Sequence, residues 1–220
     1  MKSSLVNYTK LSPNYNSRGD YKITRITPHC VVGEFSAEEV ASWKKFNDGK
    51  TASMNYVIGK DGEILCNVLE ENRAWTSGSR ENDYRAITIE CSSGAKHPYK
   101  FNEKVWESLK ELILDICKRY NKKGIIIANS AKDAIEKENN YPNFMIITYH
   151  RYFQNVECAG EWCISHMNEI RDYVNSKLLT MDSLYKVQVG AFKIRENAEK
   201  LKNKLVEQGY SDAFIIETKQ

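Results

Sequence analysis

The chain lacks any long hydrophobic run. Its first ten residues, MKSSLVNYTK, contain no apolar core of the length that a signal peptide needs. No segment approaches the roughly 18 consecutive apolar residues of a membrane-spanning helix. We therefore expect no membrane span, and synthesis in a cytoplasm without a signal peptide, so that any action outside the cell requires a separate release step.

The chain also lacks a cysteine framework and an excess of charge of either sign. The net charge is +3, from 32 basic and 29 acidic side chains, and this even balance gives no support to a nucleic-acid partner. The six cysteines are too scattered for a disulfide-rich secreted scaffold, so we expect them to be reduced and mostly buried. They are Cys30, Cys66, Cys91, Cys117, Cys158 and Cys163.

Strand-like and helical patterns alternate along residues 1–180, which predicts an α/β domain with a mixed β-sheet flanked by helices. Residues 1–20 are polar and turn-rich, and we expect an extended arm there. The expected strands are 21–32, 55–58, 64–69, 85–91, 124–128 and 144–148, the second and third joined by an Asp-Gly turn. The expected helices are one that begins at Ser36 with a capping box, 101–120 and 161–178, with one or two helical turns within 130–143.

The tail, residues 181–220, shows a separate pattern. Residues 185–192 alternate like a strand, 196–208 form an amphipathic helix that stops at Gly209, and 213–216 form a second strand. This predicts a small C-terminal β-α-β unit. Two strands and one helix rarely fold alone, so we expect the unit to pack against a partner.

Two histidines follow β-branched segments. His150 comes two positions after the end of the expected strand 144–148, and Cys158 lies eight positions further on. Imidazole and thiolate are zinc ligands, and a catalytic zinc takes three protein ligands and leaves one position open. His29, near the end of the first expected strand, is the best third ligand, whereas Cys30 points to the opposite face. A His–Cys pair is also ordinary packing, and spacing alone leaves that alternative open.

The order of several short motifs is more informative than any one of them. They are ITPHCVVG, NYVIGKDGEI, RAWTSGSR, RAITIECSS, HPY, and YHRYF followed by CAG. Over roughly residues 10–175 this order resembles the type 2 N-acetylmuramoyl-L-alanine amidases, the zinc enzymes of phage endolysins and bacterial autolysins, whose fold peptidoglycan recognition proteins share. The resemblance implies Zn²⁺ at His29, His150 and Cys158, and hydrolysis of the amide between N-acetylmuramic acid and the L-alanine of the stem peptide.

The resemblance also implies catalytic roles for Glu90 and Tyr56. A carboxylate at position 90 would take the proton of the attacking water and pass it to the leaving amine. The phenol at position 56 would hydrogen-bond the oxyanion. A surface carboxylate and a half-buried strand aromatic remain the alternatives for these two residues. The family often has a basic or hydroxyl residue and a proline where this chain has Val156 and Ala159, so one transition-state donor is missing.

Several residues are expected to contact substrate. Trp75 and Arg80 fall in a loop that such enzymes place along the glycan and peptide groove, where an indole suits sugar stacking and a guanidinium suits a carboxylate. Ordinary packing and a surface charge are the alternatives for them. His97 is a further candidate for substrate contact, and it or Arg151 could replace the missing donor. We expect His166, on the last helix of the domain, to be structural.

The tail is similar to the first half of a SPOR repeat, a peptidoglycan-binding module. We therefore expect two domains, a zinc amidase over 1–180 and a SPOR-like half-module over 181–220 that binds cell wall or forms a homodimer. The combined interpretation is a peptidoglycan hydrolase, an endolysin made in the bacterial host cytoplasm that acts at the cell wall after release. The alternatives are a non-catalytic peptidoglycan-binding protein on the same fold, and a zinc hydrolase of a different amide.

Overall fold

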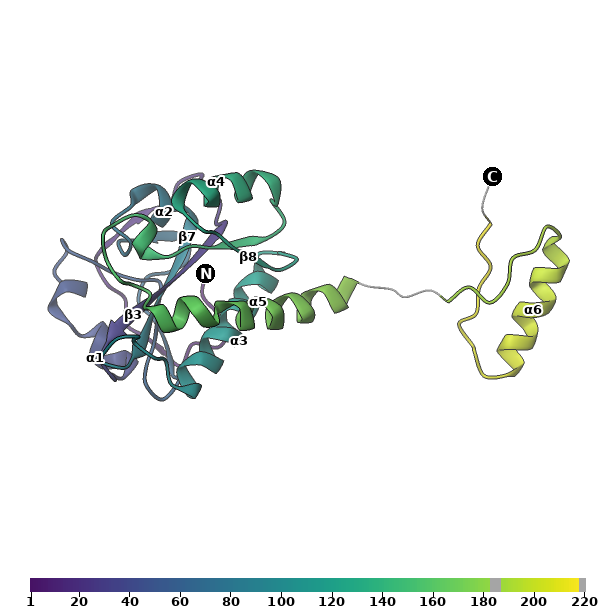
Figure 1. Ribbon diagram of the computed structural model, residues 1–220, viewed down its shortest axis with the longest axis horizontal. Helices are drawn as coiled ribbons and strands as arrows, with labels where there is room; N and C mark the ends of the chain where they lie inside the picture. The colour runs from purple at the N-terminus through teal and green to yellow at the C-terminus, as the bar shows by residue number, and fades with distance from the viewer. Residues whose placement is uncertain (183–186, 218–220) are drawn as a thin grey trace. The chain divides into compact units, whose positions relative to one another are not determined.

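The structure is a computed structural model that describes residues 1–182 and 187–217, and it divides into two compact units (Figure 1). The first unit spans Met1–Asp182 and the second Ser183–Gln220. Within the described ranges, no helix is long and apolar enough to cross a membrane.

A seven-stranded mixed sheet forms the centre of the first unit, in the order β1-β5-β4-β7-β3-β9-β8. Its longest strands, β3 and β7, run parallel side by side for eight residues each. Only β5 runs antiparallel to its neighbour β4, in the predicted Asp-Gly hairpin. The strands are β1 (Tyr8–Thr9), β3 (Arg25–Val32), β4 (Tyr56–Ile58), β5 (Ile64–Cys66), β7 (Ala86–Ser93), β8 (Ile125–Ile127) and β9 (Met145–Ile147).

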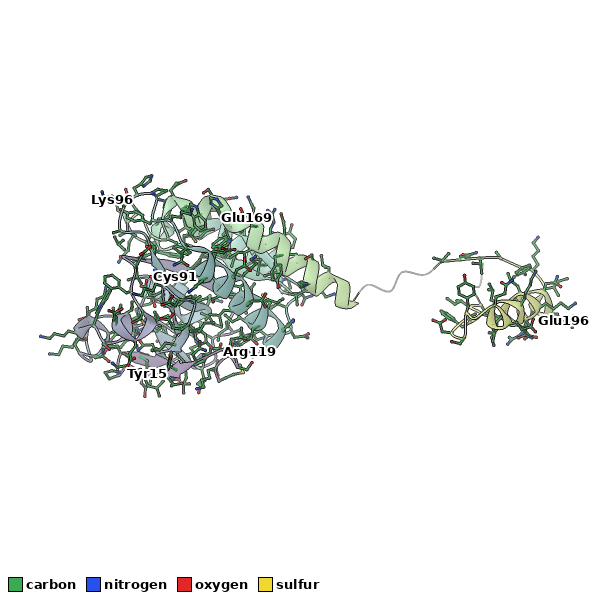
Figure 2. The ribbon with its side chains drawn as sticks, turned by 90° about the horizontal axis from the view of Figure 1, so that it is seen from below. Tyr15, Cys91, Lys96, Arg119, Glu169 and Glu196 are labelled. Carbon is green, nitrogen blue, oxygen red and sulfur yellow. The ribbon has the colours of Figure 1, made fainter. Side chains whose placement is uncertain are left out.

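Helices cover both faces of this sheet, as Figure 1 shows. One face packs against α3 (Glu103–Arg119) and α5 (Glu161–Asp182), whose apolar sides form the main core with alternate residues of the strands. The other face packs against α1 (Ala37–Ala41), α2 (Arg80–Arg85) and α4 (Ala131–Asn140). Figure 2 shows the side chains between these layers, with the buried Cys91 among them. The mixed sheet flanked by helices confirms the predicted fold class.

Local signals in the sequence set several of these elements. Ser36 caps α1 in the predicted capping box, since its hydroxyl accepts from the Glu39 N–H while the Glu39 carboxylate accepts from the Ser36 N–H. The expected extended arm also adds short strands that the sequence did not indicate. β1 joins the edge of the main sheet, and β2 (Tyr15–Ser17) pairs with β6 (Asn72–Ala74) in a separate two-stranded sheet.

The second unit is described over residues 187–217 and contains one helix, α6 (Arg195–Glu207). The predicted helix is therefore present. Among the described residues, 187–192 and 213–216 are assigned to no strand, and residues 185 and 186 of the predicted strand 185–192 lie outside the described ranges.

A buried arginine ties the sheet to the helices on the α2 and α4 side. Arg25 of β3 is fully buried, and its guanidinium donates to Glu138 of α4 at 2.7 and 2.8 Å. It also donates to Glu81 of α2 at 3.0 and 3.2 Å. These bonds satisfy the charge that burial would otherwise leave without water, and they hold the helices at the start of the two central strands.

We predict that Arg25→Met lowers the free energy of unfolding by about 3–5 kcal/mol, because the mostly buried Glu138 carboxylate loses its cationic partner. Chemical denaturation followed by circular dichroism measures the change. Lys132→Met is the matched control, since Lys132 and Glu136 form an exposed pair whose loss costs less than about 1 kcal/mol. Equal effects of the two substitutions would contradict a structural role for the Arg25 cluster.

Candidate metal centre

His29 projects from the central strand β3 onto the face covered by α1, α2 and α4. The parallel register places His29 directly beside Glu90 of β7, and Glu90 beside Val57 of β4. Residues directly opposite in register point to the same face of a sheet, so the imidazole and the carboxylate are neighbours. His29 is only 1% exposed, which fixes its ring within the fold.

The other two candidate ligands come from the segment between β9 and α5. His150 begins the short 3₁₀ helix η2 (His150–Tyr152), and Cys158 lies in the loop that follows it. The Arg151 N–H donates to the Cys158 carbonyl at 3.1 Å, which folds this loop back on itself. At Gly160, φ is +85°, and a Cβ would meet the Tyr99 side chain at 3.0 Å, so a residue without a side chain lets the loop close against the 94–100 segment.

These three side chains converge as the sequence predicts. One ligand atom from each of His29, His150 and Cys158 lies within 4.8 Å of the others. The Cys158 Sγ is 3.3 Å from the His29 Nδ1, and the two imidazole rings are 5.0 Å apart. Tetrahedral zinc with N and S ligands needs ligand atoms about 3.3–3.6 Å apart. The buried Nε2 of His29 has no hydrogen-bond partner, which is consistent with a ring held for a ligand other than the protein.

Burial and neighbouring groups shift the pKa values of the candidate ligands His29 and Cys158. Burial, and then the neighbouring His150, holds the pKa of His29 well below its usual range, so the ring is neutral and can bind a metal. The pKa of the Cys158 thiol is raised by a hydrogen bond with Cys30, by burial and by the Glu90 carboxylate. A divalent cation would reverse that effect, since a coordinating thiol is deprotonated.

Glu90 is the carboxylate that lies beside His29. Burial raises the pKa of its carboxyl to about 7, opposed by the positive charge of Lys45. A general acid or base is most effective when its pKa lies near the working pH. At neutral pH, a carboxyl with a pKa near 7 therefore exchanges protons more readily than an exposed carboxyl, whose pKa is lower. A cation beside it would lower this pKa.

The structure adds two residues that the sequence did not indicate. Lys45, in the 3₁₀ helix η1 (Lys44–Phe46), holds its ammonium 5.0 and 4.7 Å from the rings of Trp43 and Phe46. The Gln154 Oε1 accepts from the His150 Nε2 at 3.0 Å, which orients that ring. The spacing of four between His150 and Gln154 was a local signal, whereas nothing in the sequence relates Lys45 to Glu90.

Tyr56 lies on the opposite face of the sheet from this centre. It is adjacent in register to Ile89, so its side chain points into the core with α3. Its hydroxyl donates to the buried Glu70 carboxylate and accepts from the Ser3 N–H at 2.8 Å. Arg119 of α3 binds the same carboxylate with both Nη atoms, at 2.6 and 2.7 Å. The expectation that this phenol contacts the oxyanion is therefore wrong.

The residues expected to contact substrate lie in loops next to the ligand loop. The Trp75–Gly78 turn approaches Gln154 so closely that a Cβ on Gly78 would be 2.0 Å from its side chain. Trp75 is half-buried and donates through Nε1 to Asn16 at 2.8 Å, and Arg80 is exposed at the start of α2. His97 is exposed in the 94–100 segment, as is Lys96, which Figure 2 labels at the surface.

Arg151 does not replace the donor that is missing at position 156. The Arg151 guanidinium pairs with Glu161 at 3.2 Å and donates to the Glu157 carbonyl. Val156 is exposed, so no hydroxyl or cation extends from that position. His166 stacks on Trp162 with ring centroids 4.2 Å apart and bonds its carbonyl at 2.8 Å, a packing role on α5.

Comparison with known proteins identifies both units. The family profile described as N-acetylmuramoyl-L-alanine amidase matches residues 19–161, and the SPOR domain profile matches residues 169–220. No curated protein sequence matches the chain.

Solved structures share the fold at low identity. The catalytic domain of XlyA is 16% identical, with 77% of this chain and 99% of that one covered and a TM-score of 0.54. The Staphylococcus aureus hydrolase AmiA, in complex with its ligand, is 16% identical over 82% of this chain and 86% of that one, with a TM-score of 0.53. A mutant endolysin from Bacillus subtilis is 16% identical over 77% and 99%, with a TM-score of 0.51.

Because the family profile covers well over half of its length, the chain belongs to the N-acetylmuramoyl-L-alanine amidase family, with a SPOR domain at its C-terminal end. The resemblance stated from the motifs is confirmed, and the protein is an amidase of peptidoglycan by class.

We predict that Tyr56→Phe lowers the free energy of unfolding by about 1–3 kcal/mol, since the Ser3 N–H and the buried Glu70 carboxylate each lose a partner. The rate of amide hydrolysis by the folded enzyme should not change, because the hydroxyl lies across the sheet from His29. Denaturation curves and turnover of a soluble muropeptide, measured on the same preparation, test both parts. A slower enzyme with unchanged stability would contradict the placement of Tyr56 outside the site.

Proposed function

We propose that the chain is a zinc-dependent peptidoglycan hydrolase that cleaves the amide between N-acetylmuramic acid and L-alanine. The observation that carries this proposal is the convergence of His29, His150 and Cys158, whose ligand atoms lie within 4.8 Å of one another. Two imidazoles and one thiolate are a donor set that zinc accepts, and three protein ligands leave one position for water or substrate. Bound there, zinc supplies Lewis-acid activation of water and of the amide carbonyl.

The protein's own residues supply the proton transfers. Glu90 takes the proton of the attacking water, and in the next step gives it to the nitrogen of the departing L-alanine, which leaves as a neutral amine. Its place beside His29 in the register puts the carboxylate at the ligand cluster, and its burial keeps the proton available near neutral pH. Tyr56 points to the opposite face of the sheet and takes no part in these transfers. Among the described residues, Lys45 is the cation whose charge lowers the pKa of Glu90.

The loops around the cluster form the proposed substrate groove. Trp75 presents a half-buried indole on which a sugar ring can stack, and Arg80 at the start of α2 suits a stem-peptide carboxylate. His97 contacts the substrate from the 94–100 segment, which packs against Gly160. We assign these three residues to substrate binding.

A non-catalytic peptidoglycan-binding protein on the same fold is the second candidate. Such a protein needs no complete ligand set and no uncompensated carboxylate beside it. Cys158 completes the cluster, and within the described ranges no hydrogen bond or ion pair neutralises the half-buried Glu90 carboxylate. Both observations favour the enzyme.

We further propose that the enzyme works as an endolysin, made in a bacterial cytoplasm and acting on the wall after release. The fold it shares with an endolysin from Bacillus subtilis supports this role. The SPOR domain supports a function at peptidoglycan, because it adds a second unit directed at the same polymer.

Removal of one ligand tests the metal. Cys158→Ser should lose bound zinc, from about one ion per chain to a small fraction, since serine does not supply a thiolate. Atomic emission of the purified protein measures the content. Cys117→Ser is the matched control, because it changes a buried thiol of α3 on the opposite face of the sheet and should keep the ion. Retention of zinc by Cys158→Ser, or its loss only in Cys117→Ser, would contradict the ligand assignment.

Glu90→Gln tests the proton transfer. We expect the rate of amide hydrolysis to fall by about 10²–10⁴-fold with the zinc content unchanged, since glutamine keeps the shape but accepts no proton. The assay counts new α-amino groups of L-alanine released from purified cell wall, with reducing sugar ends counted in parallel. Glu136→Gln, an exposed carboxylate on α4, is the control. New reducing ends without new amines would show that a different bond is cut.

A further inference from the structure

The turn that carries Trp75 lies beside the candidate metal centre. A Cβ on Gly78 would be 2.0 Å from the side chain of Gln154, and the Gln154 Oε1 accepts from the His150 Nε2 at 3.0 Å. The turn is therefore separated from a candidate metal ligand by one side chain. The orientation of the Trp75 indole consequently determines which part of the ring is offered to a ligand at the centre.

The backbone of Trp75 is fixed through the N-terminal arm. The Ser53 N–H donates to the Trp75 carbonyl at 3.0 Å, and the Trp75 N–H donates to the Ser53 hydroxyl at 2.9 Å. The Ser53 hydroxyl in turn donates to the Asn14 carbonyl. The Asn14 side-chain amide donates to the carbonyls of Lys45 and Ala52 at 3.0 and 2.6 Å. Asn14 and Ser53 are fully buried, so water does not compete for these bonds.

Asn16 of the same arm holds the indole itself. β2, which Figure 2 marks by its label on Tyr15, pairs with β6 so that Asn16 lies opposite Arg73. The Asn16 Oδ1 accepts from the Trp75 Nε1 at 2.8 Å and from the Arg73 Nη2. The Arg73 guanidinium also lies 4.7 Å from the centre of the Tyr84 ring, which fixes the second donor. One amide oxygen thus joins the arm to the tip of the tryptophan.

The bond to Asn16 occupies the only polar atom of the Trp75 side chain. An indole has one N–H donor and no acceptor, so Trp75 has no further group for hydrogen bonds with a sugar hydroxyl. The part left for a ligand is the ring surface. An aromatic surface suits the C–H face of a sugar rather than its hydroxyls.

We propose that Asn16 is a positioning residue that sets the orientation of Trp75 and limits it to stacking on a sugar ring of the substrate. This inference rests on the proposed function, because it takes Trp75 as a residue that contacts the glycan. Asn16 precedes residues 19–161, the range that the amidase profile matches, so the contact comes from outside that range. Loss of the Asn16 acceptor lets the indole rotate, which weakens substrate binding and leaves proton transfer by Glu90 unchanged.

Steady-state hydrolysis of a soluble muropeptide tests the proposal. Asn16→Leu should raise KM by about 3–10-fold with kcat unchanged, since one hydrogen bond that orients a binding group is lost. Asn16→Asp keeps an oxygen for both donors and should restore KM. Asn168→Leu is the matched control, because Asn168 accepts from Arg171 on the exposed surface of α5. In a Trp75→Phe background, which lacks the indole N–H, Asn16→Leu should have no further effect on KM.

The indole N–H signal in nuclear magnetic resonance spectra gives a readout that needs no activity. The signal of Trp75, identified by its absence in Trp75→Phe, should shift and exchange faster with solvent in Asn16→Leu, and it should stay slow to exchange in Asn16→Asp. An unchanged signal in Asn16→Leu overturns the proposal. A rise in KM of the same size in the Trp75→Phe background, or a fall in kcat at constant KM, also overturns it.

Failure of the proposed function gives a different result. A wild-type protein that releases no amine from the muropeptide refutes hydrolysis, and the dissociation constant of the same muropeptide, measured by calorimetry, then takes the place of KM. Weaker binding by Asn16→Leu, restored in Asn16→Asp, supports the positioning role of Asn16. Equal binding by the wild-type protein and Asn16→Leu overturns it.

Discussion

The parallel register between β3 and β7 is the constraint on which the site depends. It pairs His29 with Glu90 and thereby sets the proposed metal ligand and the proposed proton acceptor side by side on one face of the sheet. A shift of one residue in either strand would turn one of the two side chains to the opposite face, into the core with α3 and α5. The buried Arg25 at the start of β3 holds α2 and α4 against that same face, so the site and its surrounding helices share one support.

The two faces of the sheet differ in the hydrogen bonds and charges that surround a buried carboxylate. On the α3 side, Glu70 is fully buried and accepts from Arg119, Tyr56 and Tyr120, so its charge is matched by a cation and two hydroxyls. On the other side, burial of Glu90 raises its pKa to about 7, and only the charge of Lys45 opposes the shift. The satisfied carboxylate is part of the structure, whereas the poorly compensated one beside the ligand cluster is suited to reaction.

The sequence predicts local structure well, but it predicts poorly to which face of the sheet a side chain of a buried strand points. The capping box at Ser36 and the Asp-Gly hairpin depend on neighbouring residues, and both are confirmed. Motif order marked the three candidate ligands, and the structure brings their side chains together. Tyr56 was misplaced because β4 is buried on both faces and reads as a continuous apolar run, so the sequence carries no alternation that separates one face from the other. Lys45 was missed because only the tertiary fold brings η1 to Glu90.

The same reasoning explains why the tail pattern was sufficient for its helix and not for its strands. A helix satisfies its own backbone, so the 3.6-residue period of α6 is sufficient to predict it. A strand is defined by a hydrogen-bonded neighbour, and the described residues 187–192 and 213–216 are assigned to no strand. Apolar alternation therefore predicts an extended segment, whereas the ladder that makes it a strand depends on a neighbour that the local pattern does not identify.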